Sequence, residues 1–125
     1  MSIDVAFWRY SETLEHDHSA VLASLESGSK VDGLAVLDTD AMIACLAELL
    51  FAWERIDERT WEKPKQHLQV WTSSQHLSIN MSFGAARPVL LRITTPMRRF
   101  GCGLWNPQLN RRLPGYDEAG AKGER

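Results

Sequence analysis

The sequence predicts a single α+β domain in which a small antiparallel sheet packs against helices, in the order β-α-α-β-β-α-β. Three observations support this fold class. The length of 125 residues matches one domain with one core. Residues 3–7 and 68–83 carry apolar side chains at alternate positions, as half-buried strands do, whereas residues 38–57 carry them at helical spacing. We place the domain at residues 1–115 and expect a flexible C-terminal tail at residues 116–125, which are rich in glycine and charge.

The first two elements are a predicted strand and a predicted helix. Residues 3–7 indicate a strand with one face on the core. A helix follows, with Ser11 or Ser19 as its cap and Ser27-Gly28 as its end. The stripe that this helix buries consists of Leu14, His18, Val21, Leu22 and Leu25.

The second helix has the clearest pattern in the chain. A loop over residues 27–37 precedes it, Asp38 or Thr39 caps it, and we expect it to run to about Asp57. Phe51 projects away from its apolar face, and so this side chain either meets a second packed element or lies exposed. The apolar face consists of Met42, Ile43, Leu46, Leu49, Leu50 and Trp53.

A hairpin is predicted over residues 67–83, with its turn at residues 72–75. One face of this hairpin is apolar and must meet the helices. The other face is polar but carries Trp71 beside Gln69. An exposed aromatic side chain on a polar face is typical of a binding hot spot, so these two residues are candidate contacts for a partner.

The pattern of residues 88–99 is ambiguous between strand and helix. Several β-branched residues favour a strand, whereas a proline at a first-turn position and a helical spacing of apolar residues favour a helix. We predict a helix that Pro96 kinks or ends. A strand at residues 101–105, a turn at residues 106–107 and a short extension to Leu113 follow.

Charge divides the chain into two halves. Residues 1–63 hold thirteen Asp and Glu against five Lys and Arg, whereas residues 64–125 hold three against nine. One interpretation is that the halves neutralise each other within the domain; the other is that the acidic half faces a partner. Asp38 and Asp40 are left out of a candidate partner-binding surface, because their negative charge is explained by the positive end of the helix dipole at the start of a helix. The remaining candidate surface consists of Asp32, Glu48, Glu54, Asp57, Glu58 and Glu62.

No cluster of residues in the sequence has the pattern of a catalytic site, and we therefore expect a binding protein and not an enzyme. Among the nucleophiles, Cys102 between two glycines is a better candidate than Cys45, which lies in the middle of a helix. His67 and His76 form the better histidine pair, because both lie on the hairpin. An alternative function is thus a small enzymatic or ligand-binding domain that uses Cys102, His67 and His76.

The arginines near the C-terminus superficially resemble a nucleic-acid surface, because they flank aromatic residues. A sequence pI of about 6.1 and the acidic half oppose this, so we do not expect nucleic acid as the partner. The simpler account is that these arginines pair with the acidic helices. A weak nucleic-acid binder stays as an alternative that would use Arg98, Arg99, Arg111 and Arg112.

The sequence does not predict a metal site or a membrane segment. His16 and His18 are two positions apart on a helix and point in different directions, so no zinc site is expected there. No apolar run approaches the roughly 20 residues of a membrane span, and the N-terminus lacks a secretory signal. We therefore expect a cytoplasmic protein.

Several short segments spread over residues 3–113 form a pattern. The most specific is Phe100-Gly-Cys-Gly-Leu-Trp-Asn-Pro-Gln108, and the others are Phe7-Trp8, Gly33-Leu34, Leu37-Asp38, Phe51-Ala-Trp53 and Ser74-Gln75. Together these segments resemble a group of small cytoplasmic immunity proteins of bacterial polymorphic and contact-dependent growth inhibition toxin systems, in which an aspartate is expected where Asn106 stands.

The resemblance implies a protein that protects its own cell by binding the C-terminal domain of a cognate toxin and blocking its active site or docking surface. It implies no reaction and no cofactor. Immunity proteins against nucleases often present acidic surfaces, because the toxin site attracts phosphate and opposite charge steers association. The acidic residues of the first half are the candidates for such a surface.

Overall fold

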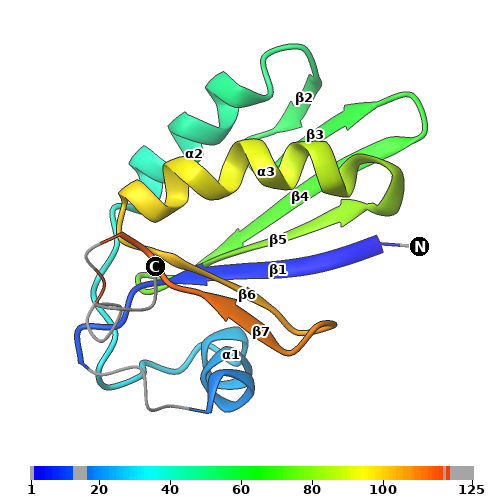
Figure 1. Ribbon diagram of the computed structural model, residues 1–125. Coiled ribbons are helices and arrows are strands. Elements are labelled where there is room, and N and C mark those ends of the chain that lie inside the picture. Colours follow the sequence, from blue (N-terminus) through cyan, green and yellow to red (C-terminus); the bar gives the residue numbers. More distant parts are fainter. Residues whose placement is uncertain (1, 13–16, 117, 119–125) are drawn as a thin grey trace.

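The computed structural model describes residues 2–12, 17–116 and 118, except for the side chains of residues 83–87. Within these residues one antiparallel sheet of seven strands packs against three helices, which confirms an α+β fold (Figure 1). The strand order across the sheet is β2-β3-β4-β5-β1-β6-β7. The elements are β1 (Ser2–Trp8), α1 (His18–Glu26), α2 (Thr39–Leu49), β2 (Glu54–Asp57), β3 (Thr60–Lys63), β4 (Gln66–Thr72), β5 (Leu77–Ser82), α3 (Phe83–Arg99), β6 (Gly103–Asn106) and β7 (Arg111–Leu113).

The interior strand β1 contributes side chains to the cores on both faces of the sheet, and helices pack on each face. Val5 and Phe7 belong to the larger core, which also holds Met42 of α2 and Ile93 of α3. Because successive side chains of a strand point to opposite faces, Trp8 belongs to a second core with α1. Figure 1 shows α2 and α3 on one side of the sheet and α1 on the other, below β6 and β7.

The second helix is shorter than predicted. It ends at Leu49, with Leu50 as its C-cap, and residues 54–57 form the edge strand β2. The reason is that Trp61 on β3 pairs with Leu68 and extends the sheet, so that β2 and β3 join as a second hairpin. The predicted element order lacked this hairpin. Phe51 lies in the connecting turn with 81% of its surface exposed.

The helix predicted at residues 88–99 is confirmed, but α3 starts earlier, at Phe83. Pro88 is therefore inside the helix and not in its first turn. Pro96 does not end the helix, which continues to Arg99. Pro96 has no N–H to donate to the carbonyl four residues earlier, so it removes one hydrogen bond about one turn before the helix ends.

The remaining elements follow the expected pattern with shifted ends. The cap of α1 is Asp17, whose Oδ1 accepts from the N–H of Ala20 at 3.2 Å, and neither Ser11 nor Ser19 takes that role. Leu14 and His16 lie outside the described residues. The predicted extension to Leu113 forms the edge strand β7. None of the described helices has the length and apolar content to span a membrane.

Candidate protein-binding face

Helix α1 covers only one end of its side of the sheet. It packs against Ala6 and Trp8 of β1 and Trp105 of β6, where strands are buried on both sides. The outward side chains of β2 to β5 have no such cover, and Trp71 among them is 48% exposed. Residues paired across neighbouring strands share a face, which defines the set. This surface, called the open face below, consists of Ser2, Asp4, Glu54, Thr60, Glu62, His67, Gln69, Trp71, Ser78 and Asn80.

A chain of hydrogen bonds crosses three strands of the open face. His67 Nε2 donates to Asn80 Oδ1 at 2.8 Å, and Asn80 Nδ2 donates to Asp4 Oδ1 at 2.7 Å and to Ser2 Oγ at 3.2 Å. These bonds hold the polar side chains in place before any partner arrives. A surface ordered in this way loses less side-chain entropy on binding.

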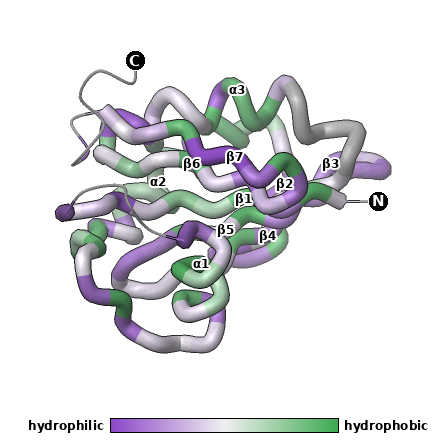
Figure 2. Tube along the Cα trace, turned by 60° about the horizontal axis from the view of Figure 1, so that its bottom comes forward, coloured by the Kyte–Doolittle hydropathy of each residue, from purple (hydrophilic) through white to green (hydrophobic). Residues whose placement is uncertain are grey.

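The acidic residues of the open face gather at the β2–β3 end. Glu54 is paired with Glu62 across the two strands, Asp57 ends β2 opposite Thr60, and Glu58 lies in the adjoining turn with Arg59. Two basic residues of this hairpin lie on the side of the helices, with Arg55 over the Trp61 ring at 5.1 Å and Lys63 over the Trp53 ring at 5.3 Å, while Arg59 in the turn donates to Thr72 Oγ1. Hydrophilic residues are visible along β3 (Figure 2). The outward side chains of β2 and β3 on the open face therefore include two carboxylates and no cation.

A pocket of about 670 Å³ lies between α1 and the open face. We call it the Trp71 pocket; Trp71 and Ser78 line it from the sheet, and Leu25 and Glu26 line it from α1. Asp4 also lines it, whereas no Lys or Arg does. Ser78 Oγ is buried and has no hydrogen-bond partner among the described residues.

The structure brings together only part of the predicted contact set. Glu54, Glu62, Gln69 and Trp71 share the open face, with Asp57 and Glu58 at its edge. Glu48 is exposed on α2, on the opposite side of the sheet. Asp32 is exposed in the loop after α1 and lies on neither element.

Cys102, His67 and His76 do not form one site. Cys102 is fully buried in the core on the helix side, and its burial raises the pKa of the thiol to about 12. His67 lies on the opposite face. His76 is buried beside the β4–β5 turn, where Ser73 Oγ lies 2.6 Å from its Nδ1 and burial lowers its pKa. Because His76 is near the turn and His67 near the far end of the hairpin, about 20 Å of strand separates them.

The four C-terminal arginines do not form a common cationic surface. Arg112 is buried, and Arg98 lies over the Tyr116 ring at 4.4 Å while its Nε donates to Pro114 O at 2.7 Å. Only Arg99 and Arg111 are exposed. The account in which these arginines pair with the acidic helices is wrong for the described residues, since no ion pair there joins the two halves of the chain.

The pairing of Arg112 with Glu118 is the feature that sequence reasoning missed. The two side chains are 3% and 0% exposed, and the guanidinium binds both carboxylate oxygens, at 2.6 and 2.7 Å. Arg112 also donates to Trp8 O at 2.7 Å, and Glu118 accepts from the N–H of Tyr10 at 2.7 Å and of Gly115 at 3.0 Å. Two ring faces flank the guanidinium, Trp8 at 5.2 Å and Tyr10 at 4.5 Å.

This buried ion pair explains part of the Gly-Cys-Gly segment. A Cβ on Gly103 would lie 2.6 Å from Arg112 Cζ, and a Cβ on Gly101 would lie 2.7 Å from Arg9 Cζ. Gly101 also has φ +83°, which favours glycine. The two glycines thus give room to two guanidinium groups, a signal that the sequence contained but that spacing alone did not reveal. Glu118 falls within the predicted tail; apart from Tyr116, the other tail residues lie outside the described part.

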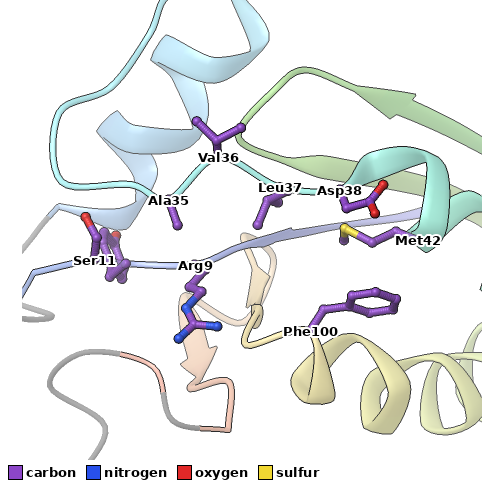
Figure 3. A pocket seen from close by; sticks show the side chains of 9 residues that line it. Arg9, Ser11, Ala35, Val36, Leu37, Asp38, Met42 and Phe100 are labelled. Atoms are coloured by element: carbon purple, nitrogen blue, oxygen red, sulfur yellow. The ribbon is translucent and has the colours of Figure 1, made fainter.

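A second pocket, of about 610 Å³, lies between the segment after β1, the segment before α2 and the C-terminal end of α3 (Figure 3). Arg9, Asp38, Met42 and Phe100 are among the residues that line it. Asp38 already accepts from the N–H of Ala41 at 3.1 Å as the cap of α2, so this carboxylate has a structural role. Within the described residues no group of three or more His, Cys, Asp or Glu could hold a metal ion.

Neither a protein-family model nor a curated protein sequence matches this chain significantly. The residues and their geometry therefore have to carry the functional argument.

Proposed function

We propose that this protein acts by protein–protein contact, as a cytoplasmic immunity protein that binds and neutralises the C-terminal domain of a cognate bacterial toxin. The observation that carries the proposal is the open face. It combines an aromatic side chain that is half exposed, an ordered polar network and an acidic end, and among the described helices α1 reaches it only at the Trp71 pocket.

The composition of this face fits a protein partner. Tryptophan is one of the residues enriched at binding hot spots, and Trp71 is half exposed in polar surroundings. Carboxylates at the rim of an interface mainly raise the association rate with a basic partner and exclude acidic ones. A nuclease toxin would present such a basic surface, since its site attracts phosphate.

The test is co-expression and direct binding with the toxin domain encoded immediately upstream. We expect the protein to form a stable complex with that domain and to restore growth of cells that express it. Reversing two charges on the open face, Glu54→Lys with Glu62→Lys, should slow association by about tenfold or more. The matched control is Glu48→Lys, an exposed carboxylate on α2, which should associate at the wild-type rate.

Two results would overturn the proposal. The first is the absence of both a complex and growth rescue with the upstream toxin domain. The second is a complex that forms equally fast with the double charge reversal and with the Glu48→Lys control, because the open face would then not be the contact surface.

A further inference from the structure

We propose that the Trp71 pocket receives an arginine side chain of the partner protein. This inference rests on the proposed function, since it names the chemistry by which the open face would recognise its partner. The pocket is lined by residues of β1, β4 and β5 and is bounded by α1, so a side chain that entered it would be held between the helix and the sheet.

The charges around the pocket favour a cation. Asp4 and Glu26 line it, both are exposed, and no Lys or Arg among the lining residues compensates them. His76 also lines the pocket, but its burial lowers its pKa and favours the neutral form at pH 7. Asp4 is held in place by Asn80, so one carboxylate is already oriented.

The shape and polarity of the walls favour a guanidinium in particular. The indole of Trp71 offers a half-exposed ring face for stacking, and Leu22 and Leu25 offer apolar contact to an aliphatic stem. Ser78 also lines the pocket, and its buried Oγ has no hydrogen-bond partner among the described residues. An arginine satisfies these requirements together, because its planar group stacks on aromatic rings while its five N–H donors reach several acceptors.

The chain uses the same chemistry in its own interior. The Arg112 guanidinium lies between the Trp8 and Tyr10 rings while it binds the Glu118 carboxylate. The Trp71 pocket offers the same combination of ring face and carboxylates, without the cation. A volume of about 670 Å³ is ample for one side chain and its flanking backbone.

The pocket is tested first without any toxin, by NMR titration of the ¹⁵N-labelled full chain. The probe is the peptide acetyl-Gly-Arg-Gly-amide. Its uncharged counterpart has citrulline in place of arginine, and a third peptide has lysine. We expect the arginine peptide to shift the indole resonance of Trp71 and the amide of Ser78 saturably, with affinity reduced about threefold or more for lysine and abolished for citrulline.

Variants of the chain then assign the binding to the pocket. Asp4→Asn with Glu26→Gln should weaken the arginine peptide by about tenfold, because both carboxylates lose their charge. Glu62→Gln lies on the same face but does not line the pocket, and it should bind as the wild type does. Absence of any shift at Trp71, or equal shifts with citrulline, lysine and arginine, would overturn the inference.

Binding to the toxin domain separates this inference from the proposed function. If the toxin domain binds the wild-type chain but binds the Asp4→Asn, Glu26→Gln variant equally well, the arginine pocket is wrong and the immunity function stands. If the toxin domain binds neither, the immunity function is wrong, and the peptide titration alone decides the pocket. A loss of toxin affinity in the variant, but not in Glu48→Gln on the opposite side of the sheet, supports both.

Discussion

Replacing Glu118 by glutamine should destabilise the whole domain. The substitution keeps the size of the side chain but leaves the Arg112 guanidinium buried without a counter-charge. Both side chains are almost fully excluded from water, so solvent does not screen the loss. The substitution also weakens the acceptor for the N–H groups of Tyr10 and Gly115, which tie residue 118 to the end of β1 and to the segment after β7.

The expected cost is about 3–5 kcal/mol of unfolding free energy, the range for breaking one partner of a buried pair. A domain of this kind has roughly 5–15 kcal/mol in total, so the substitution removes about a fifth or more of the stability of a typical domain. At this chain length about 4 °C of Tm corresponds to each kcal/mol, which predicts a decrease of about 12–20 °C. A chain truncated after Tyr116 lacks the same carboxylate and should lose at least as much.

The assay is urea and thermal unfolding followed by circular dichroism, with Glu62→Gln as the exposed control, which should change stability by less than about 0.5 kcal/mol. A double-mutant cycle with Arg112→Met isolates the interaction between the two side chains. The sum of the two single losses of unfolding free energy should exceed the loss in the double variant. If Glu118→Gln costs less than about 1 kcal/mol, the pair behaves as a surface ion pair and the reasoning is refuted.

Two further predictions concern buried titratable groups. In a Cys45→Ser background Cys102 should resist alkylation at about pH 8 until the protein unfolds, because burial raises its pKa to about 12; rapid labelling of the native protein would contradict its placement in the core. Burial lowers the pKa of His76, so the unfolded chain binds a proton first as the pH falls below about 6.5. The stability that the neutral His76 contributes should therefore be complete above that pH and decrease below it. His76→Gln should remove part of this decrease in denaturant titrations, and an unchanged pH profile would refute the role of His76.

Local patterns predicted those elements of the fold in which one face is apolar. The alternation on β4 and β5 and the helical spacing in α2 each reflect a half-buried element, and the structure confirms these elements, although α2 ends earlier than predicted. The sequence pattern predicts the end of a helix where the structure has the edge strand β2. All four of its residues are exposed, so it has no apolar face that could reveal its period. Its strand conformation comes from pairing with β3, which is a long-range effect that local sequence does not contain.

The candidate site was only partly predictable for a related reason. Strand parity placed Gln69 and Trp71 on one face, and the structure adds Glu62 and Glu54 to that face through strand pairing. The alternation of side chains along a strand does not indicate where α1 lies. The Trp71 pocket exists because α1 packs at the β1–β6 end of the sheet and does not cover β2 to β5. Glu48 shows the converse: a carboxylate near the others in sequence lies across the sheet, because the chain turns over between α2 and β2.

The charge division of the chain has a different meaning in three dimensions from either of the two sequence interpretations. The acidic half is not neutralised by ion pairs to the basic half among the described residues, and Arg112, one of the basic half's cations, is engaged with Glu118 of its own half. Arg98 binds a backbone oxygen and a ring. The positive charge near the C-terminus is therefore partly buried, while the carboxylates of β2 and β3 stay in solvent. The acidic side chains of the open face itself are Asp4, Glu54 and Glu62, and association with a basic partner should slow as salt is added, because screening acts on exposed charges first.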